Sequence, residues 1–175
     1  MSNSALSPNF VFLKRHEPQL VRLGTLAERY FKDDPCTCLI KLRQFGELLA
    51  QLTAANAGLY RDERESQLDL LRRLRDHDIV RGEVYEVFNE IRVVGNRATH
   101  DMVGTHRTAL DTLKFARKLG VWFHRTFGDR NFRPGPFVPP PDPVQESETM
   151  RQEMARLRAD VQRYQDEVAQ FQTAA

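Results

Sequence analysis

The sequence of 175 residues lacks the signatures of membrane and secreted proteins. No stretch approaches the roughly 18 consecutive apolar residues that a transmembrane helix requires. The first ten residues lack the order of a signal peptide, in which a charged region precedes an apolar one. The two cysteines, Cys36 and Cys38, flank a single residue, which is poor spacing for a disulfide. We therefore expect a soluble cytoplasmic protein with buried thiols and no membrane partner.

Sequence motifs of common cofactor and metal sites are also missing. The cysteines do not form a C-x-x-C motif, and none of the five histidines pairs with another histidine or a cysteine at ligand spacing. The chain has no P-loop, no glycine fingerprint of a dinucleotide site, no G-x-S-x-G motif and no nuclease-type carboxylate cluster. These absences predict a chain without a metal or cofactor, and they argue against ATP hydrolysis by this chain alone.

The composition of the chain favours one folded domain with an appendage. Hydrophobic residues make up 41% and charged residues 29% of the sequence, which suits a core domain of about 130 residues. Residues 1–133 hold 22 Lys and Arg against 17 Asp and Glu, whereas residues 134–175 hold four against seven. The body is therefore basic and the tail acidic. A modest basic excess is compatible with nucleic-acid contact.

Apolar residues recur at intervals of three and four along most of the chain, as in amphipathic helices. This spacing predicts five helices, over residues 16–31, 35–57, 63–75, 82–100 and 105–127. No window alternates in the way that a β-strand requires. We therefore expect an all-α fold in which about five helices form a bundle over residues 1–133. Gly95 interrupts the fourth apolar stripe, which indicates close packing or a functional role.

A proline-rich segment separates the predicted bundle from a final helix. Six of the nine prolines fall within residues 133–143, so residues 134–144 are predicted to form an extended, semi-rigid linker. Two alternatives stay open. The segment docks onto the bundle through Phe132, Phe137 and Val138, or it serves as a polyproline ligand.

Residues 145–175 carry a heptad pattern of apolar residues. The positions spaced alternately by four and three are Met150, Met154, Leu157, Val161, Tyr164, Val168 and Phe171. This seam predicts a coiled-coil helix. Because the pattern stops abruptly, we expect that the chain was cut from a longer protein whose helix continues. The alternative is a solitary amphipathic helix that folds back on the bundle.

A polar stripe on the fourth predicted helix is the main candidate for catalysis. Asn96 and His100 are four residues apart and share a face, Arg97 lies beside them, and Arg92 lies two turns before His100. An imidazole beside guanidinium groups can move a proton while arginine holds a phosphate, as metal-independent RNA cleavage requires. The structural alternative is that Asn96 and His100 form hydrogen bonds within the bundle or to the following turn.

Basic residues on three predicted helices are the candidates for phosphate contact. They are Lys41, Arg43, Arg72, Arg73, Arg75 and Arg97. The alternative is that these residues form an ordinary solvated surface. On the fifth predicted helix, Trp122 and Phe123 fit the apolar stripe, and we expect the adjacent Arg125 on a solvated face.

Four motifs carry a resemblance to a known family: FVFL at 10–13, DPCTCLIKLRQFGE at 34–47, GNRATH at 95–100 and WFHRTFG at 122–128. Together they resemble the helical N-terminal module of type I restriction enzyme restriction-subunit proteins and related bacterial DEAD/DEAH-box helicases. The resemblance covers essentially the whole chain. That module is similar to HEPN (higher eukaryotes and prokaryotes nucleotide-binding) domains, which are helical bundles and often dimeric.

The resemblance implies that a coiled coil, a nuclease domain and a helicase motor follow the module. The partners that it implies are the rest of the same polypeptide, a modification or specificity subunit, a second copy of the chain, and DNA or RNA. Active HEPN ribonucleases carry an Arg and a His separated by four to six residues. Here seven residues separate Arg92 from His100, and two separate Arg97 from His100.

We therefore expect a non-catalytic helical module at the N-terminus of a restriction-like nuclease-helicase in bacterial defence. The module mediates assembly or binds nucleic acid. One alternative is a HEPN-type ribonuclease that uses His100 with Arg92, Asn96 or Arg97. Another alternative is a module that only dimerises.

Overall fold

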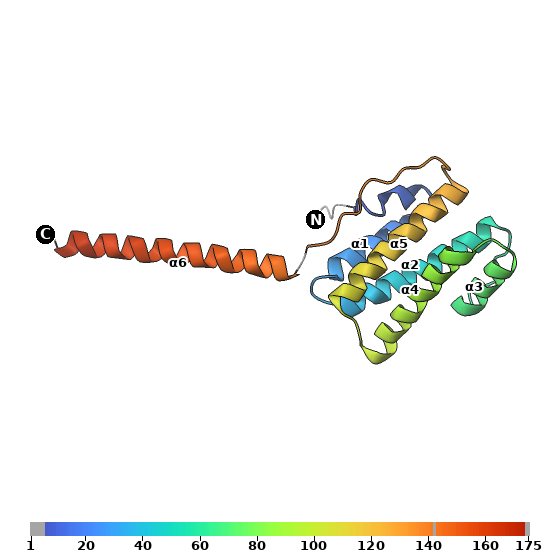
Figure 1. Cartoon of the computed structure of the whole chain (residues 1–175), viewed down its shortest axis with the longest axis horizontal. Helices are drawn as coiled ribbons and strands as arrows, with labels where there is room; N and C mark the ends of the chain where they lie inside the picture. Colours follow the sequence, from blue (N-terminus) through green and yellow to red (C-terminus); the bar gives the residue numbers. More distant parts are fainter. Residues whose placement is uncertain (1–5, 142, 174–175) are drawn as a thin grey trace. The chain divides into compact units, whose positions relative to one another are not determined.

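The computed structural model describes residues 6–141 and 143–173. The chain forms two compact units, Met1–Pro140 and Pro141–Ala175. The first unit contains a 3-10 helix and five α-helices: η1 (Val11–Arg15), α1 (Pro18–Tyr30), α2 (Pro35–Asn56), α3 (Gln67–Asp76), α4 (Gly82–Asp101) and α5 (His106–Phe127). The second contains α6 (Pro143–Thr173). Within the described residues every regular element is a helix, which confirms the predicted all-α fold (Figure 1).

Side-chain caps explain where several helices of the first unit begin. Asp34, Ser66 and Thr105 precede α2, α3 and α5, and each side-chain oxygen accepts a hydrogen bond from the backbone N–H three residues later. Such caps satisfy N–H groups that have no partner within the helix. The sequence pattern predicts that the third helix begins at residue 63, whereas the Ser66 cap places the start of α3 at Gln67.

The central helix of the first unit is α2, which packs against α1, α3, α4 and α5. Its side chains Leu39, Leu42, Phe45 and Leu49 are at most 1% exposed. Phe45 also meets Phe10 edge to face, with the ring centroids 5.2 Å apart. Because burying a side chain of this size stabilises a fold by roughly 1.5–3 kcal/mol, the residues of α2 hold the other helices together.

Two glycines allow α2 and α4 to approach closely. A Cβ added at Gly95 would lie 2.8 Å from Cγ of Arg43, and one added at Gly46 would lie 3.2 Å from Cγ2 of Ile91. Contacts under 3.0 Å to a Cβ force neighbouring atoms to move. The glycine that interrupts the fourth apolar stripe is therefore explained by helix packing.

The extended segment after α5, residues 129–140, lies against the helices of the first unit. Asn9, which is 1% exposed, donates from Nδ2 to the carbonyl oxygen of Val138 at 2.7 Å and accepts the Val138 N–H at 2.9 Å. Nε of Arg125 donates to the carbonyl oxygen of Phe132 at 2.9 Å, and Phe137 packs against the core. These contacts hold residues 132–138 against the helices, and the first compact unit extends to Pro140.

The second unit is the single helix α6, whose 31 residues include the predicted heptad seam. The seam positions from Met150 to Tyr164 are between 49% and 64% exposed. Val168 and Phe171 belong to the predicted seam, but their side chains lie outside the described residues. None of the helices in the described part of the chain combines the length and the apolar character needed to cross a membrane.

Candidate nucleic-acid interface

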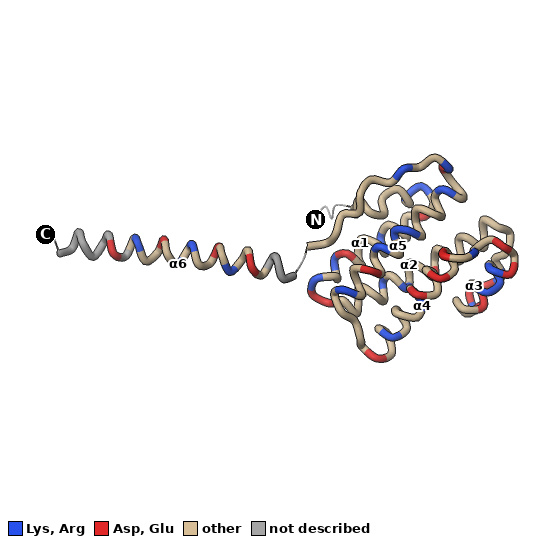
Figure 2. Tube along the Cα trace, in the orientation of Figure 1, with Lys and Arg blue, Asp and Glu red and all other residues tan. Residues whose placement is uncertain are grey.

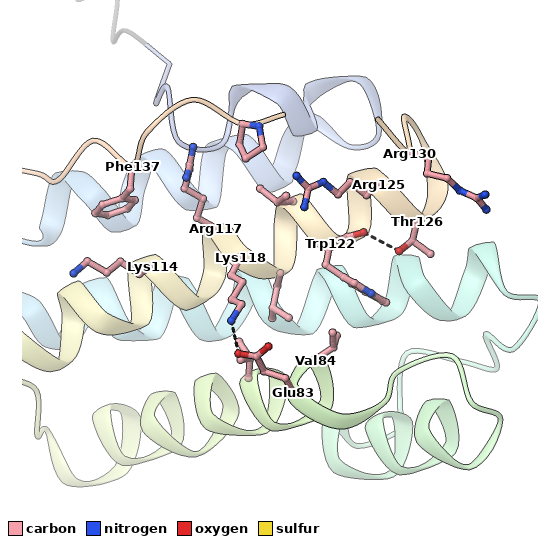
Figure 3. Close-up of a pocket in the computed structure, with 14 residues that line it drawn as sticks. Glu83, Val84, Lys114, Arg117, Lys118, Trp122, Arg125, Thr126, Arg130 and Phe137 are labelled. Atoms are coloured by element: carbon pink, nitrogen blue, oxygen red, sulfur yellow. Dashed lines mark hydrogen bonds and ion pairs between the residues drawn. The ribbon is translucent and has the colours of Figure 1, made fainter. Parts of the chain in front are cut away.

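A groove runs between α5, the start of α4 and the extended segment after α5, and it encloses about 740 Å³. Five basic residues line this α5 groove: Lys114, Arg117, Lys118, Arg125 and Arg130. Glu83 of α4 is the one carboxylate among the lining residues. Figure 3 shows the five cations on α5 and the segment after it, with Glu83 opposite them on α4. Figure 2 shows the cationic residues along α5 and in the segment that follows.

Helical periodicity gathers the basic residues of α5 on one side. Lys114, Lys118 and Arg125 follow one another at intervals of four and seven, so they share one face of the helix. The opposite face carries Ala109, Leu113, Ala116 and Phe123, all buried in the core. The burial of one face therefore fixes the direction in which the basic side chains project.

Two arginines of the groove fasten the extended segment to α5. Arg117 donates from Nη2 to the carbonyl oxygen of Gly135, and Arg125 holds the carbonyl of Phe132. Partial burial lowers the pKa of Arg117 from its ordinary value, but an arginine remains a cation at neutral pH. The two side chains therefore build one wall of the groove and also add positive charge to it.

The remaining cations are exposed and differ in their partners. Lys118 forms an ion pair with Glu83 across the groove. Lys114 and Arg130 are exposed, and no hydrogen bond or ion pair holds them within the described residues. These two side chains can reach an anion in solvent without breaking an internal contact.

The floor of the α5 groove is apolar. Val84, Val87, Trp122 and Phe137 line it. The ring of Trp122 packs edge to face against Phe88 and Phe127, with ring centroids 6.1 and 6.3 Å apart. A rigid aromatic floor between cations suits a polyanion that also carries flat apolar groups, because phosphates pair with Lys and Arg while bases stack on aromatic rings.

The basic residues that the sequence singles out lie outside this groove. Four of them contact neighbouring side chains. Nζ of Lys41 donates a hydrogen bond to Gln44 at 3.2 Å, and Nε of Arg43 forms an ion pair with Glu47 at 3.1 Å. Arg73 forms an ion pair with Glu65, and Arg75 stacks over Tyr85 and forms an ion pair with Asp76. Arg72 on α3 and Arg97 on α4 are exposed. The predicted set is therefore spread over three helices instead of forming one cluster.

The polar stripe of α4 makes contacts within the bundle. Arg92 donates from Nε and Nη2 to Oδ1 of Asn89 at 3.2 and 2.9 Å, and Asn96 accepts a hydrogen bond of 3.1 Å from Nη1 of Arg43. His100 and Arg97 are exposed. In the described part of the chain no hydrogen bond joins His100 to Arg92, Asn96 or Arg97. The stripe thus contributes to the α2–α4 contact.

A second group that the sequence did not indicate is a pair of histidines. Nε2 of His16 and Nδ1 of His124 lie 2.8 Å apart, although 108 positions separate the residues. Burial, followed by the neighbouring His124 and Arg15, lowers the pKa of His16, and burial lowers the pKa of His124 as well. The described residues contain no group of three or more potential metal ligands. The contact between the two rings is a partly buried hydrogen bond within the first unit.

The sequence held a signal for the groove but not for the histidine pair. Lys114, Lys118 and Arg125 recur on one face of α5, and this basic face could have been found by the periodicity that predicted the apolar one. Glu83 comes from α4, and Phe137 comes from the segment after α5. Only the packing of these three elements forms the site.

Comparisons with known proteins give the chain a family. Over 119 residues it is 36% identical to the type I restriction enzyme EcoKI endonuclease subunit of Escherichia coli (strain K12). This relative confirms the coarse part of the resemblance, a relation to restriction enzymes, while the HEPN-like and helicase-linked details stay predictions. The match covers 67% of this chain and 10% of the relative, so the chain spans about a tenth of the relative's length. No solved structure matches the chain.

Residues 25–122 match the family described as "Domain of unknown function (DUF4145)". The match runs from α1 to α5 and includes Lys114, Arg117, Lys118 and Trp122 of the groove. Because it covers more than half of the sequence, the chain belongs to the DUF4145 family.

Proposed function

We propose that this chain is a non-catalytic nucleic-acid-binding module at the N-terminal end of a restriction-type nuclease-helicase. The observation that carries the proposal is the α5 groove, in which five cations and one carboxylate surround an apolar floor. The similarity to a restriction endonuclease subunit supports the restriction context. In this proposal the module works in the cytoplasm with the rest of its own polypeptide and with modification or specificity subunits.

The groove binds nucleic acid through two kinds of contact. Lys114, Lys118 and Arg130 contact phosphates, because their side chains are exposed and two of them have no internal partner in the described structure. Trp122 and Phe137 offer apolar surface to a base that is not stacked in a duplex. Since exposed bases occur in single strands, the module prefers single-stranded DNA or RNA over duplex DNA.

The proposed role is positioning and not bond cleavage. His100 is exposed and has no hydrogen bond to the arginines of its helix in the described structure, and Arg92 is engaged with Asn89. A general acid or base must lie within hydrogen-bond reach of the group whose proton it moves, and a second group must orient it. The α4 stripe lacks this arrangement within one copy of the chain, as far as its residues are described.

The test is fluorescence-anisotropy titration of labelled single-stranded DNA, RNA and duplex DNA over a salt series. The triple variant Lys114→Gln, Lys118→Gln, Arg130→Gln removes three groove charges that do not hold the extended segment. We expect its affinity for single strands to fall by about tenfold or more. The slope of log affinity against log salt should decrease by about 2, at about 0.7 for each phosphate that the variant no longer neutralises.

The matched control removes three charges outside the groove: Arg72→Gln, Arg75→Gln, Arg97→Gln. We expect it to change affinity by no more than about twofold. If this control loses binding while the groove variant retains it, the interface lies on the α3 side and the proposal is wrong. RNA that is cleaved by the chain, but not by His100→Ala, would overturn the non-catalytic role.

Glu83→Gln is a second test, in which the affinity for nucleic acid should rise instead of fall. Removing this carboxylate frees Lys118 and removes a negative charge beside the phosphates. We expect affinity to rise by about two- to fivefold at low salt, the range of a single surface charge interaction. Glu86→Gln, an exposed change on α4 outside the groove lining, is the control.

A further inference from the structure

The helix α6 exposes a continuous apolar stripe. Met150 is 57%, Met154 49%, Leu157 64%, Val161 55% and Tyr164 62% exposed. These residues are spaced alternately by four and three, so they lie along one side of the helix as the core positions of a heptad repeat. A helix of this length that leaves such a stripe in water has an apolar surface suited to a second helix.

The residue types along the stripe favour a two-stranded coiled coil. In the heptad register that the spacing sets, Met154 and Val161 occupy a positions, and Met150, Leu157 and Tyr164 occupy d positions. A β-branched residue at a combined with leucine at d favours parallel dimers over higher oligomers. Val161 and Leu157 form such a pair at the centre of the described seam.

The charges beside the stripe determine the direction of pairing. Glu153 and Asp160 lie on one flank of the seam, at g positions, and Arg151 and Arg158 lie on the other flank, at e positions. Figure 2 shows acidic and basic residues following each other along α6. Each flank thus carries charges of a single sign at these positions.

Parallel and antiparallel pairs bring different flanks together. In a parallel dimer the g residue of one helix meets the e residue five positions later in the other, so Glu153 faces Arg158 of the second copy. In an antiparallel dimer equal flanks meet, and carboxylates face carboxylates. Attractive pairs form only in the parallel arrangement.

We propose that α6 pairs with α6 of a second copy of this chain as a parallel, in-register coiled coil. The occupant of the apolar stripe is therefore an identical helix, chosen by the complementary charges of its two flanks. This pairing is independent of the α5 groove and of what that groove binds. It joins two modules through their second units.

The first experiment measures the mass of the full chain by sedimentation equilibrium from about 1 µM to about 1 mM, so that both tight and weak pairing are detected. We expect the wild-type chain to dimerise. Glu153→Arg and Arg158→Glu each place like charges opposite each other, and each should weaken dimerisation by about tenfold, since two symmetric pairs change per dimer. Asp166→Arg alters charge equally but at an f position away from the seam, and its dimer should persist.

Mixing the two variants gives the decisive result. In a parallel heterodimer of Glu153→Arg with Arg158→Glu, both flanking pairs join opposite charges, so association should return to the wild-type level. A wild-type chain that stays monomeric throughout, as expected if α6 folds onto its own bundle, would overturn the proposal. So would a dimer that neither charge reversal weakens, because the pairing surface would then lie elsewhere.

Disulfide trapping tests direction separately. Met150→Cys and Val161→Cys are made in a Cys36→Ser background, while buried Cys38, whose pKa burial raises to about 12, remains unreactive. In a parallel pair each variant forms a disulfide with its own kind. If instead cross-links form only when the two variants are mixed, the helices are antiparallel and the proposal is wrong.

Discussion

His16 and His124 come from opposite ends of the first unit and meet through a hydrogen bond of 2.8 Å between ring nitrogens. His124 is 3% exposed, and it also meets Phe132 edge to face, with ring centroids 4.5 Å apart. One ring must donate and the other accept, so at least one neutral imidazole is needed. Protonating both rings would place two cations side by side in a partly buried site.

This geometry predicts an acid-sensitive fold. Both histidines have pKa values lowered from 6.5 in the folded chain, so as the pH falls below about 6.5 the unfolded chain binds protons first. The contribution of the two histidines to the free energy of unfolding should be constant above about pH 7.5 and should fall as the pH drops from there through their lowered pKa values. Thermal unfolding between about pH 8 and about pH 5 measures this dependence.

The variant His16→Gln separates this pair from other acid effects. An amide at position 16 can still donate to Nδ1 of His124 but does not titrate, so we expect the acid-induced loss of stability to be about halved. His100→Gln, a change at an exposed histidine, is the control and should retain the wild-type dependence. Equal effects of the two variants would show that the His16–His124 contact is not the cause.

At the scale of elements, the contact between α2 and α4 depends on residues without side chains. Gly46 on α2 faces Ile91, and Gly95 on α4 faces the aliphatic part of Arg43. Arg43 then continues past Gly95 to donate to Asn96. Close approach of the backbones therefore brings a polar contact to the edge of an apolar helix interface.

Gly95→Ala should destabilise the chain although alanine is the better helix former. The propensity gain is about 1 kcal/mol, whereas a Cβ at this position lies under 3.0 Å from Arg43 and pushes α4 away from α2. Overpacking of this kind costs about 1–3 kcal/mol. Because the added Cβ meets the carbons at the base of Arg43, we expect a net decrease in stability of about 1 kcal/mol, measured by urea unfolding.

The swapped pair is the control for Gly95→Ala. Arg43→Gly combined with Gly95→Ala removes the side chain from α2 that a Cβ on α4 would meet. The free energy of unfolding of this double variant should be higher than the sum of the two single changes predicts. A stabilising Gly95→Ala would contradict the close approach of α2 and α4.

At the scale of the first unit, the segment after α5 returns across the helices and is held near the N-terminal end of the chain. Asn9 makes two hydrogen bonds with Val138. Earlier in the segment, Phe132 packs on Phe12, with ring centroids 4.9 Å apart. The same segment supplies Pro134 and Phe137 to the groove.

Asn9→Ala should release this segment and damage the groove wall. The change leaves the N–H and carbonyl of Val138 without these partners, which costs about 1–3 kcal/mol. We expect faster amide hydrogen exchange at residues 132–138 and weaker single-strand binding. Asn131→Ala, an exposed change whose side chain makes no hydrogen bond in the described structure, is the control. Unchanged exchange in Asn9→Ala would show that other contacts hold the segment.

The helices of the first unit could be predicted from the sequence because their causes are local. The spacing of apolar residues by three and four marks each buried face, and Asp34, Ser66 and Thr105 mark the starts of three helices. The heptad spacing and the flanking charges of α6 are equally local, because they depend on positions within one helix. Sequence alone thus determined the all-α fold, the approximate positions of the α-helices and the apolar stripe of α6, but not the start of α3 or the 3-10 helix η1.

Only the tertiary structure decided where the proposed binding site lies in the first unit. The α5 groove needs Lys118 from α5, Glu83 from α4 and Phe137 from the extended segment, and no local pattern relates these positions. The docked segment and the histidine pair likewise join residues more than one hundred positions apart. Such contacts arise because the helices bury their apolar faces together, and that packing fixes which polar residues become neighbours.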